Sequence, residues 1–307
     1  MPLKLVLIGL GAMGKNHYRV LSSLAGIELV GLCDNTMDEF DGKKVWRDMD
    51  QMLEAIKADA AIIAAPTFLH KEMALKCAAK GLHLFIEKPA AANGDDARII
   101  KESAAALHIA VGHIERFNPV VTALKNELES KDIYSIAVTR VGPFPPRIAD
   151  VGILTDLAVH DIDLIRYITG KEIVDCHIFA SQKIHNHYED NAILSFKLQE
   201  EIVATIATNW LTPYKKRKIE VATPAGYYEA DLMSQELKSF SAYSASHSYL
   251  VRDIVVFKGE PLRNELSAFV SLCANGDRGA LATIDDSVRT LEIVNVAKKP
   301  LGFKAAL

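Results

Sequence analysis

The sequence has 307 residues, of which 50% are hydrophobic and 24% are charged, and its formal net charge is −4. This length is enough for two domains and a sizeable core, and the composition is typical of a globular protein. The acidic balance argues against a general role in binding nucleic acids. One basic run, at residues 215–218, is predicted to be a solvated strand end, with a local phosphate contact as the alternative.

Four cysteines are scattered along the chain without a CxxC pair, so the sequence indicates neither a zinc site nor a disulfide framework. The first residues lead directly into a strand pattern and carry no signal-peptide cleavage pattern. No apolar run approaches the roughly 18 residues that a membrane-spanning helix needs. We therefore expect a cytoplasmic protein with no membrane partner and no bound metal.

The first elements are a strand at residues 3–8, a glycine-rich turn and a helix at residues 12–24. The turn has the sequence Gly9-Leu10-Gly11-Ala12-Met13-Gly14. Gly9 allows the tight turn, Gly11 lets the backbone approach phosphates, and Gly14 permits close packing of helix and strand. A pyrophosphate would lie at the N-terminus of the helix in this arrangement.

A second strand, at residues 27–33, ends at Asp34, about 20 residues after Gly14. A carboxylate at this position accepts hydrogen bonds from the diol of an adenosine ribose and repels a 2′-phosphate. The alternative is an ordinary tight turn between strand and helix, and Asp34 is the strongest argument against it. The sequence therefore predicts a dinucleotide site that prefers NAD to NADP.

Strands and helices continue to alternate up to residue 112. Strands are predicted at 60–64, 82–86 and 109–112, and helices at 49–57, at 67–80 and after Asn93. This alternation is typical of an α/β protein with a doubly wound parallel sheet, in which ligands bind beyond the carboxyl ends of the strands. We expect the cofactor to contact the glycine turn, including Ala12 and Met13, and a set of residues near these strand ends: Asp34, Pro66, Thr67, His70, Glu87 and Lys88.

The pattern changes near residue 118. Helices are predicted at 119–129, 154–169, 261–275 and 283–298, and strands at 132–142, 173–183, 188–198, 201–210, 217–222 and 226–231. Short turns between successive strands indicate a mostly antiparallel sheet. We therefore divide the chain into a dinucleotide-binding domain, residues 1–117, and an α+β substrate domain, residues 118–307. The last helix is a candidate for packing back on the first domain.

Two places carry residues suited to chemistry. Lys88 precedes a proline at a strand end, and its position on the ligand rim favours a functional role over a plain surface charge. The helix at 154–169 places Asp156, His160, Asp163 and Tyr167 along one face. This face is interpreted either as a solvated polar stripe or as the lining of a cleft, with His160 transferring a proton and Asp156 supporting it.

The combination resembles the glucose–fructose oxidoreductase/inositol dehydrogenase/MocA (Gfo/Idh/MocA) family over nearly the whole chain. The resemblance rests on the glycine turn, on Glu87-Lys88-Pro89 and on Asp156-Leu157-Ala158-Val159-His160. It implies an N-terminal Rossmann domain, a C-terminal domain with a large open sheet, and Lys88, Asp156 and His160 as the catalytic set. It also implies that the open sheet joins subunits into a homodimer or homotetramer.

Residues 111–119 and 140–147 are similar to a narrower group, the UDP-N-acetylglucosamine 3-dehydrogenases. On this basis we expect a sugar-nucleotide substrate. Predicted polar contacts to the substrate, beyond Lys88, Asp156 and His160, come from Arg116, Asn118, Arg140, Arg147 and Lys215. Trp210 and Tyr214 are candidates for stacking on uracil, or are core or rim aromatics. The proline-rich segment 142–147 is either a substrate lid or a rigid connector.

Several alternatives stay open at this point. The substrate could instead be inositol or a free sugar, or the protein could be a dinucleotide-dependent regulator without turnover. Lys88 and His160 are both candidates for the base. The pattern His185-Asn186-His187 with Asp190 is interpreted as a strand turn rather than a metal site, and His17 as a packing residue or a residue on the phosphate rim.

Overall fold

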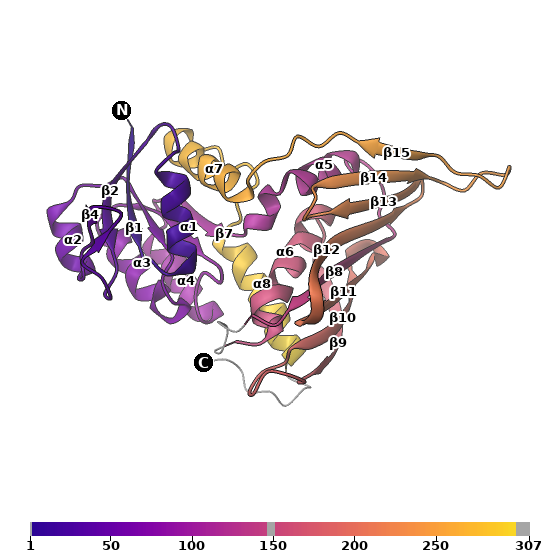
Figure 1. Cartoon of the computed structure of the whole chain (residues 1–307), viewed down its shortest axis with the longest axis horizontal. Helices are drawn as coiled ribbons and strands as arrows, with labels where there is room; N and C mark the ends of the chain where they lie inside the picture. The colour runs from indigo at the N-terminus through magenta and orange to yellow at the C-terminus, as the bar shows by residue number, and fades with distance from the viewer. Residues whose placement is uncertain (1, 146–150, 299–307) are drawn as a thin grey trace. The chain divides into compact units, whose positions relative to one another are not determined.

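The computed structural model describes residues 2–145 and 151–298, and Figure 1 shows the arrangement of the elements within each of two compact units. The first unit combines the chain up to Phe117 with Glu260–Arg289. The second combines Asn118–Gly259 with the chain from Thr290 onward. Residues 260–283 were expected in the second domain, but they pack with the first unit. The last helix was expected to pack back on the first domain, and only its start, up to Arg289, does so.

The first unit is built on a five-stranded parallel sheet with the strand order β2-β1-β5-β6-β7. Its strands are β1 (Leu3–Ile8), β2 (Ile27–Cys33), β5 (Ala60–Ile63), β6 (His83–Glu87) and β7 (Ile109–Gly112). A small pair, β3 (Glu39–Phe40) and β4 (Lys43–Lys44), lies outside it. All four residues of β5, the central strand, are buried. A parallel sheet that is covered on both faces requires this.

Helices cover both faces of this sheet. One face packs against α2 (Met49–Ala55), α3 (His70–Ala79) and α4 (Gly94–Ser103). The other packs against α1 (Ala12–Leu21) and α7 (Pro261–Asn275). Phe269 of α7 lies edge-on to Phe85 of β6, with ring centroids 5.5 Å apart. Because α1 alone does not cover all five strands, the chain returns to the first unit to bury the second face.

The second unit is built on an eight-stranded sheet with the order β15-β14-β13-β12-β8-β11-β10-β9. Its strands are β8 (Ser135–Pro143), β9 (Ile173–Ser181), β10 (Asn191–Leu198), β11 (Val203–Asn209), β12 (Leu211–Thr223), β13 (Gly226–Asp231), β14 (Glu236–Ser241) and β15 (Val251–Ile254). All neighbours are antiparallel except β8 and β11, which are parallel.

One face of this sheet carries the core. It packs against α5 (Pro119–Glu127), α6 (Val159–Thr169) and the second half of α8 (Ile284–Lys298). A π-helical turn, η3 (Leu154–Ala158), leads directly into α6. Short 3-10 turns complete the chain: η1 (Thr67–Leu69), η2 (Ile114–Phe117) and η4 (Gln199–Glu201). The predicted fold class, a doubly wound parallel sheet followed by a large and mostly antiparallel one, is confirmed. In the described part of the chain, no helix combines the length and the apolarity needed to cross a membrane.

A buried ion pair holds α6 on the sheet. Arg140 of β8 donates from Nε to Oδ1 of Asp161 at 2.8 Å, and both side chains are almost fully shielded from water. At the other end of α6, Arg166 donates to both carboxylate oxygens of Glu172, at 3.0 and 2.7 Å. Both ends of the helix are therefore fixed within the second unit.

Replacing Arg140 with methionine leaves the Asp161 carboxylate buried without its guanidinium partner. We expect a loss of about 3–5 kcal/mol of unfolding free energy, the usual cost of breaking a buried pair from one side. Urea unfolding followed by circular dichroism measures it. As a control, Lys197→Met breaks the exposed Lys197–Glu201 pair and should cost less than about 1 kcal/mol. Equal losses in the two variants would contradict the structural role of Arg140.

Candidate active site

The glycine turn packs so closely that two of its glycines cannot carry a side chain. A Cβ built on Gly14 would lie 1.9 Å from the carbonyl oxygen of Gly9. Gly9 has a φ of +93°, and its Cβ would lie 2.7 Å from the backbone of Ala64. A Cβ on Gly11, in contrast, would meet no atom within 4 Å. The space beside Gly11 is therefore open to a ligand.

The N-terminus of α1 opens onto the same place. Gly11 is its N-cap residue, no side chain caps the helix, and its first turn holds no acidic residue. Ala12 and Met13 are exposed there. Uncapped N–H groups and the positive end of the helix dipole suit an anion such as a pyrophosphate. The arrangement fits the predicted dinucleotide.

Asp34 connects the end of β2 to the glycine turn. Its carboxylate accepts hydrogen bonds from the Leu10 N–H at 2.7 Å and from the Thr36 N–H and hydroxyl at 2.9 and 2.6 Å. Burial tends to raise the pKa of Asp34, but these hydrogen bonds and the nearby Lys15 ammonium outweigh burial and hold it below its ordinary value. Asp34 is therefore ionised at neutral pH and has a fixed orientation.

A cavity of about 300 Å³ lies beside Asp34 at the carboxyl ends of the strands. Gly9, Asp34 and Pro66 line it together with apolar side chains from α2, η1 and α3, among them Met49, Leu69 and Met73. Charged side chains also line it: Arg47, Asp48, Asp50, Glu72 and Lys76. A pocket with both apolar and polar walls is suited to a nucleoside, since the base needs apolar contacts and the ribose needs hydrogen-bond acceptors. Pro66 is thus placed where the sequence predicts a cofactor contact.

Lys88 follows the last residue of β6 and is half-buried, and its peptide bond to Pro89 is cis. Glu87 is buried, and its carboxylate accepts hydrogen bonds from Nε2 of His17 at 2.6 Å and from the Lys88 N–H at 3.2 Å. Burial tends to raise the pKa of Glu87, but the hydrogen bond from His17 and the neighbouring charges hold it below its ordinary value. The Glu87 carboxylate thus holds the backbone of Lys88 at the end of β6.

His17 is one residue whose partner the sequence did not reveal. Its ring is fully buried, so it is a packing residue and not part of a phosphate rim. The available signal was helical spacing, because Gly14, His17, Tyr18 and Leu21 form the buried stripe of α1. That spacing predicts burial, but it does not identify Glu87, 70 residues away.

His70 and Thr67 lie at the end of β5. The two ring nitrogens of His70 face the carbonyl oxygens of Pro89, at 3.0 Å, and Ala65, at 2.8 Å, so the ring bridges two strand-end loops. Burial lowers the pKa of His70, and the two carbonyl groups oppose this shift. The helix predicted at 67–80 is divided: Thr67 begins the short turn η1, and α3 starts only at His70. His70 therefore connects two loops of the predicted cofactor site.

In the second unit, the predicted helix at 154–169 is divided. Asp156 lies in the π-helical turn η3, and His160 is the second residue of α6. Both are half-buried. Asp163, expected on the same face, is 1% exposed, so the stripe is not a solvated polar face. Single π-helical turns often occur at functional sites, because the wider turn changes the direction of the side chains that follow.

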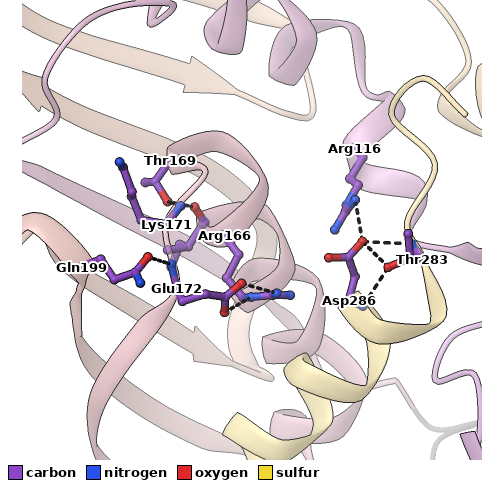
Figure 2. A network of polar contacts seen from close by, with 9 residues as sticks. Arg116, Arg166, Thr169, Lys171, Glu172, Gln199, Thr283 and Asp286 are labelled. Atoms are coloured by element: carbon purple, nitrogen blue, oxygen red, sulfur yellow. Dashed lines mark hydrogen bonds and ion pairs between the residues drawn. The ribbon is translucent and has the colours of Figure 1, made fainter. Parts of the chain in front are cut away.

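Two residues predicted to bind substrate have structural contacts. Arg116 is buried, and its guanidinium faces the Asp286 carboxylate at 3.5 Å, where Asp286 and Thr283 cap the start of α8 (Figure 2). Asn118 caps α5 by accepting a hydrogen bond from the Val120 N–H, and it donates to the Leu232 carbonyl. These contacts give Arg116 and Asn118 structural roles at helix ends, and their binding to the substrate stays a prediction.

The other residues that were predicted to contact a sugar nucleotide differ in burial. Arg140 pairs with Asp161 in the core, whereas Lys215 and Tyr214 are exposed. Trp210 is 3% exposed and lies edge-on to Phe144, with ring centroids 5.7 Å apart, so it is a core aromatic. Arg147 lies outside the described residues.

The His185–Asp190 turn is held by backbone contacts. Asp190 accepts hydrogen bonds from the N–H groups of residues 183–185, and Nδ1 of His185 accepts from the N–H groups of His187 and Tyr188. Among residues 2–145 and 151–298, no group of three or more acidic, histidine or cysteine side chains could hold a metal ion.

Substitutions at Gly11 and Gly14 should have different effects, the first on cofactor binding and the second on stability. Gly11→Val should leave the melting temperature unchanged, because its Cβ meets open space, but should weaken NAD⁺ binding by at least about tenfold, since it blocks the approach of the pyrophosphate. Gly14→Ala should destabilise the protein by about 1–3 kcal/mol or more. Thermal unfolding and titration calorimetry with NAD⁺ measure both. Tight binding by Gly11→Val would contradict the site.

Comparison with known proteins agrees with this geometry. The profile of the oxidoreductase family with an NAD-binding Rossmann fold (GFO_IDH_MocA) matches residues 3–113, and that of the GFO/IDH/MocA C-terminal domain matches residues 142–229. Inositol 2-dehydrogenase 2 of Saccharopolyspora erythraea is 25% identical over 92% of this chain and 88% of its own length. UDP-N-acetylglucosamine 3-dehydrogenase of Acidithiobacillus ferrooxidans is 27% identical over 75% of this chain and 74% of its own length.

Solved structures show the same fold. The UDP-N-acetylglucosamine 3-dehydrogenase from Acidithiobacillus ferrooxidans matches with a TM-score of 0.88 at 22% identity, over 97% of each chain. An oxidoreductase from Agrobacterium radiobacter, solved with NAD⁺, L-tartaric acid and magnesium, matches with a TM-score of 0.85 at 18% identity, over 97% of this chain and 96% of its own. The resemblance seen in the sequence is confirmed, and the chain belongs to the Gfo/Idh/MocA family of NAD-dependent oxidoreductases.

Proposed function

We propose that this protein oxidises a secondary hydroxyl of a sugar or polyol with NAD⁺, and that its substrate is UDP-N-acetylglucosamine, oxidised at C3 to the 3-keto sugar nucleotide. The observation that carries the reaction type is the open, uncapped glycine turn beside Asp34, on the same sheet edge as Lys88. The similarity to a UDP-N-acetylglucosamine 3-dehydrogenase supports the choice of substrate.

Oxidation of an alcohol removes a hydride from carbon and a proton from oxygen. When bound, NAD⁺ supplies the hydride acceptor at C4 of its nicotinamide. In the proposal, the Lys88 ammonium orients the substrate hydroxyl and stabilises developing negative charge on its oxygen. His160 accepts the proton, and Asp156 stabilises the resulting imidazolium.

Oxidation of an inositol is a second candidate function. The inositol dehydrogenase relative is similar over a larger share of this chain than the sugar-nucleotide enzyme. The chemistry at Lys88 and His160 is the same for both substrates, because each presents a secondary hydroxyl. The two candidates differ in the diphosphate, which only the sugar nucleotide carries.

The proposal includes a preference for NAD over NADP. Asp34 lies at the ribose end of the predicted site, and its low pKa keeps its negative charge at neutral pH. A 2′-phosphate would meet this charge at close range. We also place the enzyme in the cytoplasm, where its four free cysteines stay reduced.

A substrate panel tests the function. We expect UDP-N-acetylglucosamine to give reduced nicotinamide at 340 nm with NAD⁺, roughly tenfold or more faster than with NADP⁺, the ratio that about 1.4 kcal/mol of discrimination gives. Lys88→Met and His160→Asn should each lower kcat by about 100-fold or more, since each removes a group that acts on the reacting hydroxyl. The panel also contains myo-inositol, scyllo-inositol and free glucose.

The panel separates the alternatives. Turnover of an inositol but no UDP-sugar would replace the substrate and retain the reaction. Full turnover by Lys88→Met or His160→Asn would contradict the assigned roles. As a control, Lys80→Met changes an exposed lysine at the end of α3 and should keep wild-type kcat.

The proposal also includes self-association through the outward face of the large sheet. This face carries exposed apolar side chains on neighbouring strands: Phe179 is 79% exposed, Ile193 55% and Val203 52%. Phe179 and Ile193 lie directly opposite each other on β9 and β10. Adjacent exposed apolar side chains are typical of an interaction surface, which supports a homodimer or homotetramer formed here.

Charge placed on this face should dissociate the assembly. Ile193→Lys should raise the dissociation constant at least about tenfold, because the new ammonium would have to be buried without a partner. Sedimentation velocity measures it. Ile99→Lys, which places the same charge on exposed α4 of the first unit, is the matched control. Unchanged association of Ile193→Lys would exclude this face.

A further inference from the structure

We propose that His17 is a positioning residue of the reaction: by holding the buried Glu87 carboxylate, it fixes Lys88 relative to the dinucleotide-binding turn. The inference rests on the proposed role of Lys88. It concerns a residue that neither the glycine motif nor the Glu87-Lys88-Pro89 sequence contains. The contacts run from the ring of His17 to the Glu87 carboxylate and from there to the backbone of Lys88.

The ring of His17 is buried and held by one polar contact. Its ring is 0% exposed and lies edge-on to Phe85, with centroids 5.5 Å apart. Nε2 makes the 2.6 Å contact with Oε1 of Glu87, whereas Nδ1 is buried without a hydrogen-bond partner among the described residues. The ring is thus oriented by one polar contact. A buried imidazole that only filled space would be replaceable by a hydrocarbon at little cost.

The Glu87 carboxylate is confined by its neighbours. Glu87 pairs with Gly112 of the neighbouring strand, and a Cβ on Gly112 would lie 3.1–3.3 Å from the carboxylate atoms. The carboxylate therefore lies directly over Gly112 on one side, and its Oε1 receives the hydrogen bond from His17. Such confinement leaves the carboxylate one arrangement, because a buried charge without a donor is costly.

The Glu87 carboxylate also contacts the backbone of Lys88. The second oxygen of Glu87, Oε2, accepts the backbone N–H of Lys88 at 3.2 Å. His17 lies in α1, about one turn after Gly14 of the glycine turn. A continuous set of contacts thus runs from the cofactor-binding helix through Glu87 to the backbone of Lys88. His17 does not touch the reacting atoms in this scheme and acts through Glu87.

The test compares three substitutions in α1. His17→Phe keeps an aromatic ring and removes the donor, His17→Gln keeps an amide donor at a comparable reach, and Val20→Ala is a control that loosens the same helix at a fully buried position. Two quantities are measured: kcat and KM for NAD⁺ in the reaction found by the panel, and the rate at which an amine-reactive acetyl ester labels Lys88, read by mass spectrometry.

For His17→Phe we expect kcat to fall by about 10- to 100-fold, because misplacing a reacting group by about 1 Å costs on the order of 100-fold. KM for NAD⁺ should change by less than about twofold, since the glycine turn is intact. Lys88 should be labelled several-fold faster, because its backbone is held less firmly. His17→Gln should restore at least about half of the wild-type kcat, and Val20→Ala should leave kcat and labelling unchanged.

A double-mutant comparison tests the route through Glu87. If His17 acts through this carboxylate, adding His17→Phe to Glu87→Gln should change kcat by less than about twofold beyond Glu87→Gln alone. Equal effects of His17→Phe and Val20→Ala, or no rescue by His17→Gln, would overturn the proposal. If Lys88→Met retains wild-type turnover, the proposed function fails instead, and the labelling rate alone still decides whether His17 positions Lys88.

Discussion

In each unit, a carboxylate shielded from water lies one residue from the group that we assign to the chemistry. Glu87 precedes Lys88, and Asp161 follows His160. An unpaired buried charge costs several kcal/mol, so each carboxylate requires a partner from a distant element. His17 comes from α1 and Arg140 from β8. The requirement for pairing therefore fixes α1 to β6 and α6 to β8. The backbones of Lys88 and His160, the two proposed catalytic residues, are held in place by these pairs. A surface pair would not have this effect, because water can replace either partner.

The first unit depends on a second constraint, the burial of both faces of its parallel sheet. Strands such as β5 have no polar side to expose, so helices must cover the sheet on each face. α1 supplies one part of its face, and the remainder is covered by α7, more than 140 residues after the sheet ends. The same return brings Arg278 to the Ile109 carbonyl at 2.9 Å. The cofactor-binding unit thus includes the chain up to Arg289, and its stability depends on residues far from the glycine motif.

Much of the first unit could be predicted from the sequence, because its signals are local. The strand at residues 3–8, the glycine turn and the strand ending before Asp34 all depend on neighbouring residues, and β1 and β2 have the predicted bounds. The assignment of 260–283 failed because an amphipathic helix does not specify which sheet it covers. The parallel pairing of β8 with β11, and the strands β14 and β15, were not predicted either, because partner choice is decided by long-range packing. The π-helical turn at Asp156 has no signal in helical spacing, which only assumes a regular α-helix.

The arginines show the same limit and bear on the substrate. Arg116 and Arg140 were predicted to bind a diphosphate because arginine pairs well with phosphate. The sequence contains equally good partners for them, however, and the fold brings them to Asp286 and Asp161. Arg140 and Asp161 are both buried, so the cost of separating the pair holds Arg140 in place, whereas Asp286 is partly exposed. Recognition of a diphosphate would therefore rely on exposed cations such as Lys215, whose side chain packs beside Gly142. An inositol carries no diphosphate, so removing the charge at position 215 is expected to affect only a sugar-nucleotide substrate.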